Sequence, residues 1–180
     1  DGTVRFGGNL LEVRSELVKL VAGDHFKQRP GEFELTSQNS GTLEFSAASD
    51  LEYVHRFRRL TEVLLRSSLP ATVREDIRLA IEEMGKNAIE WGNNGQRDKR
   101  VYLAYCLDED RITFRIRDEG DGFDRTAVPD PSADPMEHMA YRQSIGKRPG
   151  GYGLRIIQGL MDSVVYNDKG NAVVLTKYLS

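Results

Sequence analysis

The chain of 180 residues has the composition of an ordinary soluble globular protein, with 39% hydrophobic and 29% charged residues. Its formal net charge is −3 and its basic residues are scattered, which argues against a nucleic-acid-binding protein, because such proteins gather Lys and Arg on one surface. No apolar run approaches the roughly 20 residues that a membrane helix needs, so we expect no association with a membrane.

Cysteine and histidine are too sparse for a disulfide framework or a metal centre. Cys106 is the single cysteine, and His25, His55 and His138 stand far apart without the spacing of metal ligands. A metal held by protein ligands alone is therefore not expected, and a reducing, cytoplasmic setting fits best. The chain begins with Asp1 instead of Met, so we expect it to be a fragment of something longer.

The first 40 residues differ from the rest and are expected to form an N-terminal arm. Apolar residues recur at near-helical spacing over residues 9–22, which predicts one amphipathic helix. A polar segment with Pro30, Gly31 and Ser40 follows, and it has the composition of a linker. One helix cannot bury its own apolar face, so the arm is expected to be the connector to, or the remnant of, an upstream domain.

A compact α+β domain is predicted over residues 41–180. Its first elements are a strand over residues 42–47, a helix over about 50–68 and a longer helix over about 71–91. The longer helix carries one continuous apolar stripe at spacings of three, four and seven residues. The sequence Gly-Asn-Asn-Gly at 92–95 ends it, because these residues tolerate left-handed backbone.

Further strands and one more helix complete the predicted domain. Residues 100–106 and 111–117 are expected to be strands, and the second alternates apolar with polar side chains, so one of its faces is buried. A helix is predicted from the glycines at 150–153 through Met161. Residues 163–166 and 172–179 are expected to pair as a final hairpin.

A long polar stretch separates Phe123 from about Arg148. It contains Pro129, Pro131 and Pro135 together with several charges. Loops of this length are uncommon inside a compact domain, and they are usually functional lids or disordered segments. We therefore expect a lid or a disordered loop here.

Glu83 and Asn87 lie on the long predicted helix, roughly 40° apart at about 100° per residue. Both stand at one edge of the apolar stripe, so they face the crevice beside the core, where a ligand can reach them. For this pair alone the plainer interpretation is stronger, because the helix also carries Glu82 and Glu90 and has many solvated carboxylates.

Two glycine-containing segments are candidate ligand-binding loops. Residues 118–123 (Asp-Glu-Gly-Asp-Gly-Phe) follow a strand directly, and Asp118 can accept a hydrogen bond from an exocyclic amine such as that of adenine. Residues 150–154 (Gly-Gly-Tyr-Gly-Leu) open a helix, whose first N–H groups attract anions such as phosphate. Taken singly, a simple turn explains the first segment equally well, and an ordinary helix start explains the second.

The order of these features is far more specific than any one of them. An acid four residues before Asn on a helix, then strand-Asp-x-Gly-x-Gly, then a loop, then Gly-x-Gly opening a helix, resembles the N, G1 and G2 boxes of the gyrase, Hsp90, histidine kinase and MutL superfamily (GHKL, or Bergerat fold). Within it, four segments resemble the anti-sigma-factor serine/threonine kinases: LEFSAASD (43–50), IEEMGKNAIEWGN (81–93), RDEGDGF (117–123) and GGYGLRIIQGLMD (150–162). The resemblance spans about residues 42–179.

The resemblance implies an α/β (α+β) two-layer sandwich, with a mixed, mostly antiparallel sheet and helices on one face. It implies that Glu83 is the general base, which takes the proton from the attacking hydroxyl or orients a water. It implies that Asn87 is the Mg²⁺ ligand, with phosphates and waters completing the shell. Asp118 is implied to anchor adenine, with Gly120 and Gly122 packed against the base.

The phosphate side of the site follows from the same resemblance. Gly151 and Gly153, followed by Leu154, match the phosphate loop, and the long polar stretch matches the ATP lid. Lys147 and Arg148 stand at the end of the lid, where they could reach the γ-phosphate. Ordinary solvated charges explain these two residues at least as well.

The match leaves some points open. The last hairpin has Gly170-Asn171 where the superfamily usually has Gly-Thr, so an adenine-side hydrogen bond there must come from Asn171 or from Thr176. His55 invites a phosphoacceptor role, but its helix belongs to the ATP domain itself, and a surface histidine is the favoured interpretation. Trp91 is expected to pack against the core and not to stack on a base.

The function implied by the resemblance is protein phosphorylation. The kinase would use ATP and Mg²⁺ to phosphorylate a serine or threonine of a small anti-sigma-factor antagonist of the STAS type, and would regulate transcription by partner switching with a sigma factor. One acid and Mg²⁺ suffice for phosphoryl transfer, which needs mainly positioning and charge neutralisation. Two alternatives stay open: a non-catalytic nucleotide-dependent binding module, and an ATPase domain cut from a larger signalling protein. The sequence is compatible with a homodimer.

Overall fold

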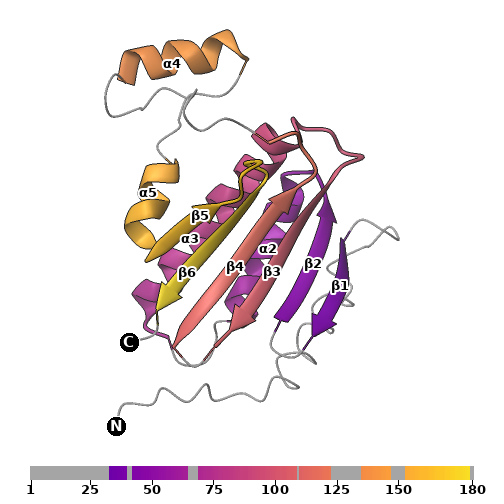
Figure 1. Ribbon diagram of the computed structural model, residues 1–180, viewed down its shortest axis with the longest axis vertical. Coiled ribbons are helices and arrows are strands. Elements are labelled where there is room, and N and C mark those ends of the chain that lie inside the picture. The colour runs from indigo at the N-terminus through magenta and orange to yellow at the C-terminus, as the bar shows by residue number, and fades with distance from the viewer. Residues whose placement is uncertain are drawn as a thin grey trace.

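The computed structural model describes residues 33–39, 42–64, 69–108, 110–122, 135–146 and 153–178. They form a two-layer α+β sandwich, in which helices cover one face of a six-stranded sheet (Figure 1). The fold class expected from the sequence is confirmed. The helix predicted over residues 9–22 and the predicted site residues Lys147, Arg148 and Gly151 lie outside the described residues.

The elements follow the chain as two strands, a helical pair, a central hairpin, two short helices and a final hairpin. The strands are β1 (Phe33–Asn39), β2 (Thr42–Ala48), β3 (Arg100–Leu107), β4 (Arg111–Asp118), β5 (Ser163–Tyr166) and β6 (Ala172–Tyr178). The helices are α2 (Glu52–Leu64), α3 (Ala71–Asn87), the π-helical turn η1 (Ala88–Gly92), α4 (Pro135–Ser144) and α5 (Gly153–Leu160). None of the helices in the described segments has the length and apolar character to cross a bilayer.

The sheet has the strand order β1-β2-β3-β4-β6-β5. Every pairing between its described strands is antiparallel, so the mixed character expected from the resemblance is not found in this part of the chain. β3 and β4 lie at the centre, and their register sets Val101 opposite Asp118 and Tyr105 opposite Phe114. This register places the end of β4 next to the start of β3, at one end of the sheet.

One strand lies in the segment expected to be a linker. β1 pairs with β2 along its length, from Phe33 opposite Ala47 to Asn39 opposite Thr42. The linker interpretation is therefore wrong for residues 33–39. An edge strand pairs on one side only and tolerates a polar sequence, which is why the composition did not reveal it. The division of the chain into an arm and a domain at residue 40 stays a prediction.

The core lies between the sheet and helices α2, α3 and α5. In β4 the buried residues alternate with more exposed ones, as the sequence pattern predicts. The apolar stripe predicted for the long helix is also buried in α3. The largest fully buried side chains come from both layers: Phe45, Phe57, Phe114, Ile77, Ile81, Met84, Leu103, Ile112 and Ile157.

The long predicted helix is α-helical for most of its length and ends in one π-helical turn. The change falls directly after Asn87, and the N–H of Asn93 donates to the carbonyl oxygen of the first residue of η1 at 2.8 Å. Asn94 and Gly95 follow with φ angles of 55° and 70°, which confirms the predicted left-handed ending. Single π-helical turns are rare and frequently occur at functional sites.

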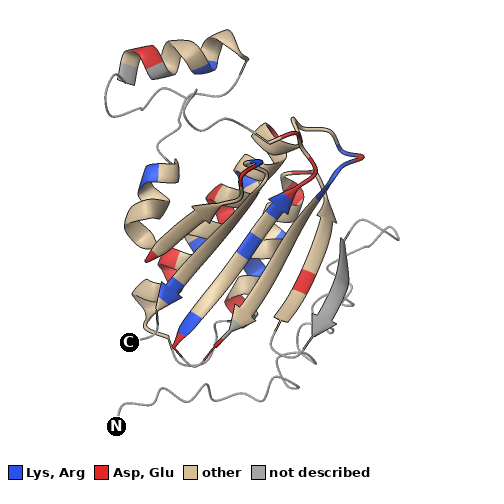
Figure 2. Ribbon diagram, in the orientation of Figure 1, with Lys and Arg blue, Asp and Glu red and all other residues tan. Residues whose placement is uncertain are grey.

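The sheet face away from the helices carries charged side chains, and Figure 2 shows basic positions recurring along β4. Arg115 of β4 reaches across β3 to Glu44 of β2, with Nη2 and Oε2 2.7 Å apart. Ala104 lies between these two residues in the register and is only 7% exposed. Arg117 lies over the ring of its register partner Tyr102, 3.8 Å from the centroid. Paired charges and aromatic contacts therefore cover this face of the sheet.

A helix stands within the polar stretch expected to be a lid or a disordered loop. α4 occupies Pro135–Ser144, so the alternative of a disordered loop is wrong for these residues, and the lid stays a prediction. Pro135, a loop signal in the sequence, is the first residue of this helix, where the missing N–H of proline costs nothing. Figure 1 shows α4 set apart from the sheet. Arg142 of α4 lies over the ring of Trp91 in η1, 4.7 Å from its centroid.

Candidate functional site

The predicted site residues meet at one end of the sheet, where four segments converge. These segments are the end of α3 with η1, the loop after β4, the turn between β5 and β6, and the first turn of α5. Close contacts at glycines join them, and two examples are Gly92 against the side chain of Asp118 and Gly153 against the side chain of Glu83. Segments that are far apart in the sequence therefore form one site.

Asp118 is the buried acid of this site. It ends β4 and is 6% exposed, and burial raises the pKa of its carboxyl group. The N–H of Gly120 donates to its Oδ1 at 2.8 Å. An added Cβ at Gly92 would lie 2.2 Å from the carboxyl carbon of Asp118, and one at Gly120 would lie 1.9 Å from the carbonyl oxygen of Gly92. Glycine at both positions lets the helix end close on the carboxyl group.

The loop after β4 is fixed by two side chains that were not expected in the site. Asn93 is fully buried, its Nδ2 donates to the carbonyl oxygen of Arg100 at 2.9 Å, and its Oδ1 accepts from the N–H of Glu119 at 2.8 Å. Glu119 accepts from the N–H of Arg100 at 2.9 Å and from the hydroxyl of Tyr102 at 2.7 Å. The second of these bonds raises the pKa of the Tyr102 phenol. The backbone next to Asp118 is therefore held from two elements.

Asn171, where the family pattern has threonine, bonds to the end of β4. Its side-chain Nδ2 donates to the backbone carbonyl oxygen of Asp118 at 3.2 Å. Its backbone carbonyl oxygen accepts from the backbone N–H of Asp118 at 3.0 Å. Asn167 orients the amide, because its Nδ2 donates to Oδ1 of Asn171 at 2.8 Å. Thr176 lies farther along β6, opposite Thr113. Of the two candidates left open by the sequence, Asn171 is the one beside Asp118.

Gly122 packs against the turn between β5 and β6. Its φ angle is 82°, and an added Cβ would lie 1.7 Å from the carbonyl oxygen of Lys169. Both the left-handed conformation and the close approach require glycine. The loop after β4 and this turn are therefore packed backbone against backbone.

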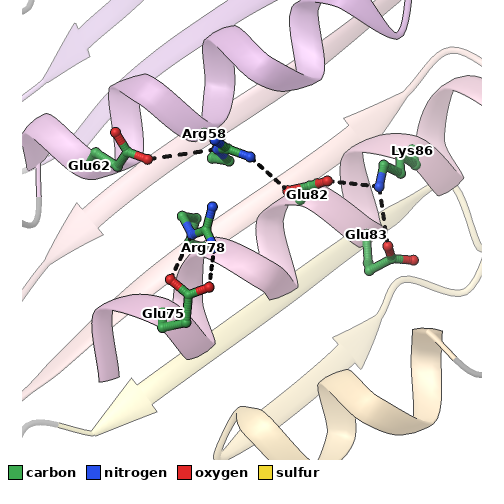
Figure 3. Close-up of polar contacts among 7 residues, drawn as sticks. All are labelled: Arg58, Glu62, Glu75, Arg78, Glu82, Glu83 and Lys86. Atoms are coloured by element: carbon green, nitrogen blue, oxygen red, sulfur yellow. Dashed lines mark hydrogen bonds and ion pairs between the residues drawn. The ribbon is translucent and has the colours of Figure 1, made fainter. Parts of the chain in front are cut away.

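Glu83 lies on the side of α3 that meets the start of α5. Its side chain is 39% exposed, and its Oε2 would lie 2.7 Å from a Cβ added at Gly153. The carboxylate is thus next to the N-terminus of a helix, where the first N–H groups favour negative charge. Nζ of Lys86 lies 3.4 Å from the other oxygen, Oε1 (Figure 3). The predicted base therefore lies between an ammonium group and a helix start.

Asn87 stands one turn after Glu83 and ends α3. It is half-buried, and a side-chain amide oxygen is a ligand type that Mg²⁺ accepts. In the described segments no group of three or more His, Cys, Asp and Glu side chains is arranged to hold a metal ion. The donor chemistry fits the predicted role, in which phosphates and waters supply the rest of the shell.

Three other predicted residues have clear environments. Trp91 is half-buried outside the buried core cluster and packs against Arg142 of α4, so its predicted packing partner is wrong. His55 is exposed on α2, as expected for a surface histidine. Leu154 packs its side chain against the core, which leaves its backbone for any contact with a ligand.

Besides Asn93 and Glu119, sequence reasoning missed two further neighbours of the predicted residues, Lys86 and Gly92. Lys86 stands three residues after Glu83 and four after Glu82, and this spacing of opposite charges on a helix was a readable signal. Gly92 was expected only as a helix end. Its contact with Asp118 depends on how the π-helical turn meets the end of β4, for which the sequence carries no local signal.

Comparison with known proteins places this site in a described family. A family model described as "Histidine kinase-like ATPase domain" matches residues 47–177. The chain belongs to this family. The matched range contains the described site residues Glu83, Asn87, Asp118 and Gly153.

Three relatives in this family align with most of the chain. It is 31% identical over 152 residues to the serine-protein kinase RsbW of Listeria monocytogenes, covering 81% of this chain and 90% of that protein. It is 30% identical over 145 residues to the serine-protein kinase RsbW of Bacillus subtilis, with coverages of 79% and 88%. The anti-sigma F factor of Bacillus thuringiensis is 31% identical over 148 residues, with coverages of 79% and 94%. The resemblance seen in the sequence motifs is therefore confirmed.

Proposed function

We propose that this protein is a kinase that transfers the γ-phosphoryl group of ATP, with Mg²⁺, to a serine or threonine of another protein. One observation carries the proposal: two acids of different character meet at one end of the sheet. Asp118 is buried at the end of β4, and Glu83 of α3 is half-exposed and faces the first residue of α5. The family match supports the use of ATP. The relatives named serine-protein kinase support transfer to a protein hydroxyl.

The adenine base is proposed to bind beside Asp118. Its exocyclic amine would donate to the carboxylate, and a donor of this kind stabilises the ionised form that burial disfavours. Gly120 and Gly122 leave the backbone without side chains on this side, so a flat ring can approach closely. A base without an amine at that position would leave a buried carboxylate unsatisfied, which is costly.

The phosphates are proposed to bind at the first turn of α5, near Gly153, where helix N–H groups attract anions. Asn87 is proposed as the protein's ligand to Mg²⁺, which when bound neutralises phosphate charge and holds the phosphate oxygens in place. Lys147, Arg148 and Gly151 are proposed to complete this side from the segment that precedes α5.

Glu83 is proposed to act as the general base. The hydroxyl oxygen of the acceptor forms the new bond to phosphorus, the bond to the bridging oxygen of ADP breaks, and the hydroxyl proton passes to the Glu83 carboxylate. Half exposure suits this role, because the hydroxyl of a second protein must reach the carboxylate. A positioned base typically contributes about 10²- to 10⁴-fold to such a rate.

The acceptor is proposed to be a small antagonist protein, and a sigma factor is proposed as the partner with which it alternates. The relative named anti-sigma F factor supports this assignment. Phosphorylation of the antagonist would then decide which of the two is bound, and so regulate transcription. The assignment rests on analogy within the family and on no single residue.

Transfer of label from γ-labelled ATP with Mg²⁺ in a host lysate tests the proposal, with wild type compared against Glu83→Ala. Label on one small protein with the wild type only would support a kinase and identify its substrate. Absence of transfer by a wild type that binds ATP would contradict the kinase proposal and favour a nucleotide-dependent binding module. Transfer by Glu83→Ala would remove Glu83 from the role of base.

A further inference from the structure

Lys86 contacts two acidic residues that precede it by one turn on α3 (Figure 3). Its Nζ is 2.8 Å from Oε1 of Glu82 and 3.4 Å from Oε1 of Glu83. The hydrogen bond to Glu82 raises the pKa of the Lys86 ammonium group. Lys86 is therefore a charged group with one close partner and one looser partner.

Glu82 is itself held from a second helix. Arg58 of α2 has Nη1 3.6 Å from Oε2 of Glu82, and its Nε lies 3.7 Å from Oε1 of Glu62. The hydrogen bond from Lys86 lowers the pKa of Glu82, and Arg58 acts in the same direction. The side chains of Glu82 and Lys86 are only 17% and 28% exposed, so water screens this pair less than an ordinary surface pair. The position of the Lys86 ammonium group therefore depends on α2 as well as on α3.

The two carboxylate oxygens of Glu83 face different groups. Oε1 faces the ammonium group of Lys86, and Oε2 lies at Gly153, at the start of α5. A half-exposed glutamate has several rotamers of similar energy and loses that freedom only where a partner holds it. Lys86 is shared between two carboxylates, because its closer contact is with Glu82 and its longer contact is with Glu83.

We propose that Lys86 is a positioning residue that aims the second oxygen of Glu83 at the start of α5. The inference rests on the proposed role of Glu83 as the base. Arg58 and Glu82 hold Lys86, Lys86 holds Oε1 of Glu83, and Oε2 accepts the proton of the attacking hydroxyl. The catalytic carboxylate is thus oriented by an ion-pair chain that begins on α2.

Single-turnover release of phosphate from Mg-ATP, with water as the acceptor, tests the role in Lys86→Met. Methionine keeps most of the side-chain length and removes the charge. The rate at saturating Mg-ATP should fall about tenfold, because small misplacements of a reacting group can cost up to about 100-fold. The dissociation constant of Mg-ATP should stay unchanged, and Lys86→Arg, which restores a positive charge, should recover most of the rate.

Arg78→Met is the matched control. Arg78 pairs with Glu75 on the same helix, with Nε 2.8 Å from Oε2, and lies about two turns before Lys86 (Figure 3). This variant also removes one basic side chain and one ion pair from α3, and it should release phosphate at the wild-type rate. A loss equal to that of Lys86→Met would mean that any charge on this helix affects the rate, and it would overturn the proposal.

The contact can also be measured without turnover, from the side-chain ammonium ¹⁵N signal of Lys86 in nucleotide-free protein. Glu83→Gln should shift this signal, and Arg78→Met should leave it in place. An unchanged signal in Glu83→Gln overturns the proposal, and so does a wild-type rate in Lys86→Met. If the wild type binds Mg-ATP but neither releases phosphate nor transfers label to a protein, the proposed catalysis itself is wrong and the positioning role falls with it. If the wild type transfers label without releasing phosphate, the same variants are compared by their transfer rates.

Discussion

The two sides of the site are built in different ways. On the adenine side, Asp118 is 6% exposed and is enclosed by backbone at Gly92 and Gly120. On the phosphate side, Glu83 is 39% exposed and is oriented by an ion pair with Lys86. Backbone contacts cannot rearrange without moving whole elements, whereas an ion pair between half-exposed side chains can.

This difference suggests a division of tasks between the two sides. A rigid, desolvated acceptor suits recognition of a ligand, because its geometry is fixed before the ligand arrives. A half-exposed carboxylate suits chemistry with a second protein, which must approach it from solution. Changes on the Asp118 side should therefore alter affinity and stability, and changes on the Glu83 side should alter rate.

The largest expected effect is that of Glu83→Gln on phosphoryl transfer. The amide keeps the size of the side chain but accepts no proton, so the transfer rate should fall by about 10²- to 10⁴-fold. Affinity for Mg-ATP and the unfolding midpoint should stay at the wild-type values. Rapid-quench kinetics with labelled ATP, together with a binding titration, measure both. A variant that loses affinity as much as rate would show that the two sides are not separate.

Two glycine substitutions offer a matched comparison of the sides. A Cβ at Gly120 would lie 1.9 Å from a backbone oxygen, whereas, among the described residues, the nearest atom to one at Gly153 is the flexible end of the Glu83 side chain, at 2.7 Å. Gly120→Ala should lower the free energy of unfolding by about 1–3 kcal/mol, as overpacking does. Gly153→Ala should change it by less than about 1 kcal/mol, since alanine also favours the helix. Denaturant unfolding measures both, and equal losses would contradict the contrast.

The smallest expected effect is a pH dependence of opposite sign on the two sides. Burial raises the pKa of Asp118 above its usual 3.8. The ionised carboxylate therefore lowers the free energy of unfolding above the raised pKa, and this loss of stability is absent below pH 3.8. Asp118→Asn should therefore be more stable than wild type at pH 7, by on the order of 1 kcal/mol, and this gain should vanish in acid.

Glu82 should behave in the opposite way. Lys86 lowers the pKa of Glu82 below its usual 4.5, so the pairing stabilises the fold above pH 4.5 and is lost as the pH falls through the lowered pKa. Glu82→Gln should lose up to about 1 kcal/mol at pH 7 and less in acid. Urea unfolding of both variants across this range checks the signs. A stability gain for Glu82→Gln at pH 7 would contradict the assignment.

Most of the fold could be predicted from periodicity and turn chemistry, and the exceptions have physical causes. β4 alternates buried and exposed residues, and α3 carries a continuous apolar stripe, because each packs one face against the core. β1 and α4 escaped prediction for other reasons. β1 is an edge strand, and α4 begins at a proline inside a polar stretch.

The site was predictable where its residues form motifs and unpredictable where distant backbone segments meet. Glu83, Asp118 and Gly153 stand in patterns that carry their chemistry locally. The contact between Gly92 and Asp118 requires the π-helical turn and the end of β4 to meet, and no local pattern encodes that meeting. Lys86 lies between these cases, since its helical spacing was visible but its anchoring through Arg58 was not.

The most direct test of the account is a calorimetric titration of Mg-ATP into the wild type and into Asp118→Asn. The wild type should bind, and the variant should bind at least about tenfold more weakly, because a hydrogen bond to a charged acceptor contributes about 1.5–3 kcal/mol. The variant should remain folded, as its expected gain in stability requires. Equal affinity in the two proteins would contradict the assignment of Asp118 as the adenine acceptor, and with it the account of the buried side of the site.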